Sequence, residues 1–131
     1  MHNIRADEVL HVVTPDEPGI YGRVLGTLAN AGVNLKAISV RSEAGKGHFL
    51  LLTADNAKAA KALKSLGYKV SAEKVITAEI GDRIGAGAEI GVLLGNAAVY
   101  VEYCFGSSAG LGSALLVFKT NDNKKAIDTL K

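Results

Sequence analysis

The sequence predicts an α+β fold in which two βαββαβ units follow one another along a single chain. At an offset of 66 residues, Val9, Asp16 and Gly19 fall on Val75, Asp82 and Gly85. Both stretches alternate short apolar runs, typical of strands, with the apolar spacing of amphipathic helices. Matching residues at one steady offset, within the same local patterns, indicate an internal duplication.

The duplication continues at an offset of 67 residues, because the second copy contains one extra residue. Asp55-Asn56 then matches Asp122-Asn123, and Leu63-Lys64 matches Leu130-Lys131. We therefore predict an N-terminal tail (residues 1–6), a first module (residues 7–72) and a second module (residues 73–131).

Each copy is predicted to contain its elements in the same order. The first copy has a strand at residues 8–13 and a helix at 19–30, which carries Ile20, Val24 and Leu28 on one face. It continues with strands at 33–41 and 48–54, a helix that starts at Asp55 or Asn56, and a brief strand at 68–70. The second copy has strands at 74–80, 99–106 and 113–120, and helices at 85–96 and from Asp122.

A βαββαβ unit folds into the ferredoxin-like architecture, with four antiparallel strands and both helices on one face. The two helices leave the other face and the edge strands of the sheet uncovered. Two copies in one chain cover an edge strand of each sheet if the two sheets join edge to edge. The sequence predicts no fourth strand for the second copy, because Lys131 matches Lys64. Three explanations remain open: truncation, another segment of this chain, or a partner chain.

The composition argues against several classes of protein. A net charge of +2 with no basic stripe is atypical of a nucleic-acid binder. One cysteine excludes a disulfide framework or a Cys-based zinc site, and no metal or cofactor is expected. The N-terminus lacks the apolar region of a secretory signal, and no apolar run would span a bilayer, so we expect a cytoplasmic protein.

The corner between the first strand and the first helix has the chemistry of an anion site. Pro18 suits the first turn of a helix, and Gly19 allows close approach of either backbone or ligand. The first helical amides and the positive end of the helix dipole then attract a carboxylate. In the second copy Gly85 and Ala86 keep the side chains small, but Ile84 replaces the proline. Tight strand–helix packing is the alternative explanation for the glycines.

The pattern Asp16-Glu17-Pro18-Gly19, followed by Asn30-Ala31-Gly32-Val33-Asn34, resembles the ACT domain family. The likeness extends over residues 7–131, with Asp82-Arg83-Ile84-Gly85 and Val99-Tyr100-Val101 in the second copy. The resemblance implies small regulatory modules that bind amino acids and pair through the second strand and the adjacent helix.

The resemblance also implies which residues contact a ligand between paired modules. The first module would contribute Thr14, Asp16, Pro18, Gly19 and Ile20, with Asn34 and Leu35 on the second strand. The second module would contribute Asp82, Gly85, Ala86, Tyr100 and Val101. An aspartate suits an α-ammonium group, and Asn34 offers both a donor and an acceptor. Tyr100 departs from the asparagine of the first copy, which puts a second equivalent pocket in doubt.

We therefore expect a non-catalytic sensor that binds a small amino acid and acts through ligand-dependent assembly, as a homo-oligomer such as a dimer, or through a partner. The alternative is a regulatory subunit that binds an enzyme of amino-acid metabolism whether or not ligand is present. Glycines four residues apart in both first helices, Gly22 with Gly26 and Gly91 with Gly95, would allow another helix to approach in an oligomer.

Other functions fit the sequence less well. Residues 85–91 miss the dinucleotide-binding pattern G-x-G-x-x-G, because Ile90 takes the last glycine position. An RNA-recognition module needs several aromatics on its third strand, and each copy has one phenylalanine there. A copper carrier of this fold needs C-x-x-C, which is absent.

The sequence shows no catalytic constellation. His11 and His48 lie on predicted strands and would meet across the sheet, but no motif places a nucleophile or a carboxylate beside them. We expect them to occupy a half-exposed sheet surface. Cys104 is expected to be a small core or interface residue.

Overall fold

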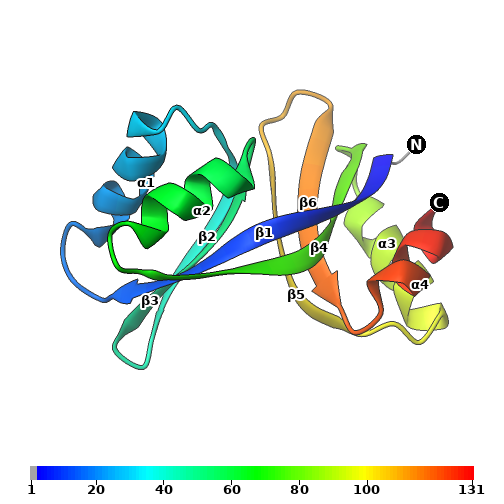
Figure 1. The fold of residues 1–131 in the computed structure, drawn as a ribbon. Coiled ribbons are helices and arrows are strands. Elements are labelled where there is room, and N and C mark those ends of the chain that lie inside the picture. The colour runs from blue at the N-terminus through cyan, green and yellow to red at the C-terminus, as the bar shows by residue number, and fades with distance from the viewer. Residues whose placement is uncertain (1–2) are drawn as a thin grey trace. The chain divides into compact units, whose positions relative to one another are not determined.

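The computed structural model describes residues 3–131 and contains six strands and four helices (Figure 1). The strands are β1 (Asn3–Pro15), β2 (Leu35–Glu43), β3 (Lys46–Thr53), β4 (Lys69–Gly81), β5 (Val101–Ser108) and β6 (Ser113–Thr120). The helices are α1 (Ile20–Asn30), α2 (Asn56–Lys64), α3 (Ala86–Asn96) and α4 (Asn123–Leu130). The order βαββαβ followed by αββα confirms the predicted ferredoxin-like α+β class.

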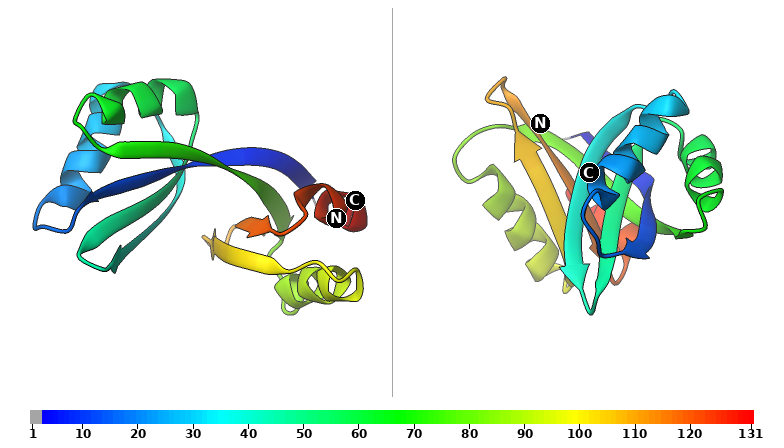
Figure 2. Two further views of the ribbon diagram at one scale, coloured as in Figure 1. Left: turned by 60° about the horizontal axis from the view of Figure 1, so that its bottom comes forward. Right: turned by 90° about the vertical axis from the view of Figure 1, so that its left-hand side faces the viewer.

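The first compact unit comprises Glu8–Glu73, with hydrogen-bonded strands in the order β2-β3-β1-β4. Strands β1 and β2 both pair antiparallel with β3. Helices α1 and α2 contact each other and lie together on one side of these strands in both views of Figure 2. Their apolar faces bury one core cluster, which contains Leu10, Val12, Val24, Leu28, Phe49, Leu51 and Leu63.

The second compact unit combines Lys74–Lys131 with the described residues up to Asp7. Its strand order is β5-β6-β4-β1, and β6 pairs antiparallel with both β4 and β5. Helices α3 and α4 contact each other, as α1 and α2 do. The core cluster of this unit contains Ile4, Ile76, Ala78, Ile90, Leu94, Phe118 and Leu130.

The long strands β1 and β4 each belong to both units. Residues 3–7 of β1 lie beside β4 in the second unit and take the position of its fourth strand, for which the sequence alone offered three explanations. Likewise, the brief strand predicted at 68–70 and the strand predicted at 74–80 form the single strand β4. Another segment of the same chain therefore completes the second sheet.

Residues 3–6, expected to belong to an N-terminal tail, are instead part of β1. Their polar sequence gives no strand signal, because Ile4 is the only large apolar side chain in residues 3–8. Ile4 is nevertheless 6% exposed and packs into the core of the second unit. One buried contact and the hydrogen bonds to β4 thus form a strand that side-chain alternation does not reveal. The rest of the expected tail, residues 1–2, lies outside the described residues.

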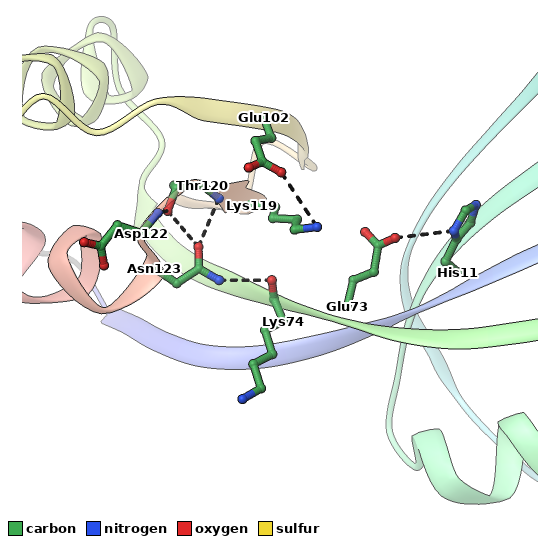
Figure 3. A network of polar contacts seen from close by, with 8 residues as sticks. All are labelled: His11, Glu73, Lys74, Glu102, Lys119, Thr120, Asp122 and Asn123. Carbon is green, nitrogen blue, oxygen red and sulfur yellow. Dashed lines mark hydrogen bonds and ion pairs between the residues drawn. The ribbon is translucent and has the colours of Figure 1, made fainter.

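The second helix of each unit starts with the same set of polar contacts. The Asp55 carboxylate accepts a hydrogen bond from the Lys58 amide at 3.1 Å, and Asp122 accepts one from Lys125 at 3.1 Å. The first residue of each helix then attaches it to the sheet. Asn56 donates to the Glu8 carbonyl at 3.0 Å. Asn123 donates to the Lys74 carbonyl at 3.0 Å (Figure 3). The duplication therefore includes the hydrogen bonds that cap the second helix and attach it to the sheet, as well as the strand–helix corners.

No helix in the described part of the chain is long and apolar enough to cross a membrane.

Candidate functional site

The corner of the first module reverses the chain between β1 and α1 within four residues. Gly19 stands immediately before α1 with a φ of 88°, in the left-handed region that favours glycine. A Cβ built at Gly19 would meet no atom within 4 Å. The glycine is therefore needed for its backbone conformation, and tight strand–helix packing does not explain it.

The corner of the second module repeats this geometry. Gly85 has a φ of 88° and also has open space where a Cβ would stand. The Ala86 amide donates to the Arg83 carbonyl at 3.2 Å, as the Ile20 amide does to the Glu17 carbonyl at 3.2 Å. Ile84 fills the place of Pro18 with a fully exposed side chain. The backbone turn is thus retained without the proline.

The helices that begin at the two corners lack side-chain caps. Within the described structure, no side chain forms a capping hydrogen bond at the N-terminus of α1 or α3. By contrast, Asp55 and Asp122 cap α2 and α4. An uncapped N-terminus combines outward amides with the positive end of the helix dipole, which favours an anion.

Each corner also carries an aspartate that is held by a serine. Ser42 at the end of β2 donates to the Asp16 carboxylate, and Ser108 at the end of β5 donates to Asp82. All four residues are exposed. Neither serine was predicted from the sequence, although each follows its aspartate by 26 residues in both copies, a spacing that could have revealed the pair.

An ion pair at each corner has opposite polarity in the two modules. In the first, Arg23 on α1 contacts Glu17 in the loop at 3.3 Å. In the second, the loop residue is Arg83 and the helix residue is Glu89, at 2.5 Å. Hydrogen bonds with Tyr68 and then Glu17 raise the pKa of Arg23, and the bond with Glu89 raises the pKa of Arg83. The first loop therefore presents an acid where the second presents a base.

Three of the predicted ligand residues lie in the interior of the fold. Thr14 is 2% exposed, and its hydroxyl donates to the Pro15 carbonyl at 3.0 Å. Ile20 and Ala86 are buried in the cores beneath α1 and α3. The exposed predicted residues that gather at the corners are Asp16, Pro18 and Gly19 in one module and Asp82 and Gly85 in the other.

The predicted residues on the second strands lie at the far end of each sheet from the corner. In the first module Leu35 is opposite Thr53, whereas the other end of β2 is opposite Lys46, which also pairs with Pro15 beside the corner. Asn34 is exposed and precedes Leu35 at the far end. Val101 and the 69%-exposed Tyr100 occupy the matching end of β5. A single module therefore does not bring its corner and its second-strand residues together.

His11 and His48 meet across neighbouring strands, as the sequence predicted. His11 Nε2 lies 3.0 Å from His48 Nδ1. On its other side, His11 Nδ1 lies 3.3 Å from Glu73 Oε2 (Figure 3). Burial lowers the pKa of His11 and outweighs the opposing effect of Glu73, while His48, Arg41 and Lys69 lower it further. The carboxylate beside His11 carries no sequence motif and was not predicted.

Cys104 lies on β5 in the other unit and is exposed, so it is not a core residue, and the alternative expectation of an interface residue stays a prediction. Nearby atoms still desolvate its thiol enough to raise its pKa, which disfavours the reactive thiolate. Across the described residues, no group of three or more histidine, cysteine or acidic side chains is arranged to hold a metal ion.

Comparisons with known proteins agree with this architecture. Residues 9–68 match the model of the ACT domain. A crystal structure of a protein from Bacteroides thetaiotaomicron superposes with a TM-score of 0.90 at 24% identity, over 97% of this chain and 88% of that one. No curated protein matches the sequence.

Two further crystal structures are regulatory subunits of aspartate kinase. The one from Thermus thermophilus has a TM-score of 0.73 at 13% identity and covers 98% of this chain and 93% of its own. The one from Thermus flavus has a TM-score of 0.67 at 16% identity, with 98% and 94% covered. At these identities the likeness establishes the fold.

The first module thus matches the ACT domain over residues 9–68, and the internal repeat and the shared fold make the second module similar to it.

Proposed function

We propose that the chain is a regulatory protein without catalytic activity that binds a small amino acid at its strand–helix corners. The observation that carries the proposal is the contrast among the helix N-termini. Helices α2 and α4 are capped by their own aspartates, whereas α1 and α3 have no side-chain cap in the described structure. An α-carboxylate would satisfy these amides, and the adjacent Asp16 would bind the α-ammonium.

Pairing of modules would complete the site. In each module the corner lies near the end of the second strand, while the predicted strand residue lies at its beginning. Antiparallel pairing of two such edge strands places the beginning of one beside the end of the other. Asn34 or Tyr100 of one module would then approach the corner of another, so the proposed site forms in a homo-oligomer such as a dimer. The glycines Gly22 and Gly26 on α1 would allow a close helix contact.

A thermal-shift screen of the twenty amino acids, each at millimolar concentration, tests this function. A ligand present at about 100 times its Kd should add roughly 2.7 kcal/mol to the free energy of unfolding and raise Tm by several degrees. One responding amino acid, or one chemical class, would support the proposal. A flat screen would contradict ligand sensing by the isolated protein.

Asp16→Asn and its matched counterpart Asp82→Asn then locate the site. We expect Asp16→Asn to weaken binding of the responding amino acid about tenfold or more, because loss of one charge-assisted contact costs about 1.5–3 kcal/mol. Asp82→Asn should have a smaller effect, since Ile84 in place of Pro18 and Arg83 in place of Glu17 make the second corner different. Unchanged affinity in a folded Asp16→Asn variant, measured by calorimetry, would exclude the first corner as the site.

A second candidate function is a regulatory subunit that binds an enzyme of amino-acid metabolism independently of ligand. Exposed apolar side chains on α3, β5 and their flanking loops favour it: Ile84, Val92, Leu93, Tyr100, Val101 and Leu111. Two structures with this fold are regulatory subunits of aspartate kinase. Equal binding to a purified candidate enzyme with and without the responding amino acid would favour this function over sensing.

A further inference from the structure

The pair His11 and His48, with Glu73 behind it, takes no part in the proposed amino-acid site. The three side chains come from three neighbouring strands, in the order β3-β1-β4. The side chains of His11 and Glu73 are both only 23% exposed, and His48 is half-buried. Sites on strands hold their side chains more firmly than sites on loops.

One ring nitrogen of His11 faces one ring nitrogen of His48, and the tautomers of the two rings decide what lies between them. Glu73 lies beside Nδ1 of His11, which favours the tautomer with the proton on Nδ1 and a lone pair on Nε2. This lone pair points at His48 Nδ1, 3.0 Å away. A proton carried by His48 Nδ1 can occupy the space between the rings. When His48 instead carries its proton on Nε2, the two lone pairs face each other, and a bound cation would remove their repulsion.

We propose that His11 Nε2 and His48 Nδ1 bind one divalent transition-metal ion, such as Zn²⁺, Ni²⁺ or Cu²⁺, with Glu73 as a positioning residue. Bonds of about 2.0–2.1 Å at a tetrahedral ion place two imidazole nitrogens about 3.3 Å apart, which requires little movement from the structure. A histidine that binds a metal commonly donates its other N–H to a carboxylate, as His11 is placed to do. Because the described residues offer no third ligand here, water would complete the coordination.

Two positive side chains limit the affinity of this site. Arg41 and Lys69 both contribute a positive potential at His11. Arg41 is opposite His48 in the strand register, but its guanidinium contacts Glu43 at 3.2 Å, which offsets part of its charge. The site therefore favours ions with strong affinity for imidazole over hard cations such as Mg²⁺.

The second module provides an internal comparison. Thr77 and Leu115 occupy the positions that match His11 and His48 in the repeat. The chain has three histidines, so His2 is the only other imidazole. The stoichiometry expected for this site is one ion per chain, and His2→Ala is the matched control.

Calorimetric titration of the full chain, freed of metal with EDTA, tests the site with Zn²⁺ and then Ni²⁺ as probes. We expect one ion per chain. His11→Gln and His48→Gln should each weaken binding at least tenfold, Glu73→Gln should weaken it about 10–100-fold, and His2→Ala should leave it unchanged. Circular dichroism checks that each variant is folded.

Several results would overturn the proposal. Wild-type affinity in His48→Gln, loss of binding in His2→Ala, or no binding at millimolar metal would each exclude the histidine pair as the site. Unchanged affinity in Glu73→Gln would exclude the positioning role. If His11→Gln does not fold, ring resonances of the unaltered protein decide: Zn²⁺ must shift the signals of His11 and His48, and an absence of shifts contradicts the proposal.

Discussion

The two strand–helix corners share a backbone and differ in chemistry. Both turn through a glycine with a φ of 88°, both begin an uncapped helix, and both hold an aspartate with a serine. The first corner adds Pro18 and an acidic loop residue, whereas the second adds an exposed isoleucine and a basic one. Of the shared features, the glycine is the one that the turn itself requires.

The differences all lie in side chains that the turn does not constrain. Glu17 and Arg23 exchange positions with Arg83 and Glu89, so each module keeps an ion pair while the sign of its loop is reversed. An exposed ion pair contributes little to stability, and its polarity is therefore free to change. The duplicated corners thus preserve a backbone turn and diverge in the charge that surrounds it.

The largest effects should come from the two cores. Phe49 and Phe118 are each at most 2% exposed, one in each core cluster. Replacement by alanine should reduce the free energy of unfolding by about 3–5 kcal/mol in either case, through lost burial and the cavity left behind. Urea unfolding measures the loss, and hydrogen exchange shows whether it stays within the altered unit. A cost below 1 kcal/mol at either position would contradict the described packing.

Ile4→Ala should produce the next largest loss of stability, and its effect should be confined to the second unit. Ile4 is the buried side chain that attaches residues 3–7 to the second core, so its truncation should cost about 2–5 kcal/mol. Amides of β4 and β6 should exchange faster, while those of β3 should change much less. Asn3→Ala is the matched control, because Asn3 is exposed and should have little effect. Equal changes of the exchange rates in both units would argue against the assignment of residues 3–7 to the second unit.

The sequence predicted the repeat, the element types and the meeting of the two histidines, because each depends on periodic or paired residues. It did not predict the course of β1 before residue 8, since one apolar residue in a polar segment shows no alternation. Ser42, Ser108 and Glu73 were missed for another reason: each acts through a neighbour that is distant in the chain. The separation of Asn34 from its own corner follows from strand direction and required the register.

Gly19→Ala and Gly85→Ala compare the two turns. Each substitution forces an alanine into the left-handed region and should cost roughly 1–2 kcal/mol, because the space around both glycines is open and only the backbone is strained. Gly22→Ala is the control, since it lies within α1 and should stabilise by up to about 1 kcal/mol. A much larger cost at one corner, measured by urea unfolding, would show that the two turns are not equivalent.

The smallest change in stability should come from exchanging the charges of the first corner. The double variant Glu17→Arg, Arg23→Glu gives the first module the polarity of the second, and the pair can still form. The free energy of unfolding should therefore change by less than about 1 kcal/mol. The affinity for the responding amino acid should change more than the stability, because Glu17 stands next to Asp16, the proposed ammonium partner.

The reciprocal variant Arg83→Glu, Glu89→Arg is the matched control at the second corner. Calorimetry with both variants at low salt, where charges act most strongly, measures the effect. Unchanged affinity in the first variant would mean that the loop charge plays no part in binding, and the amino acid would then be held by Asp16 and the helix amides alone.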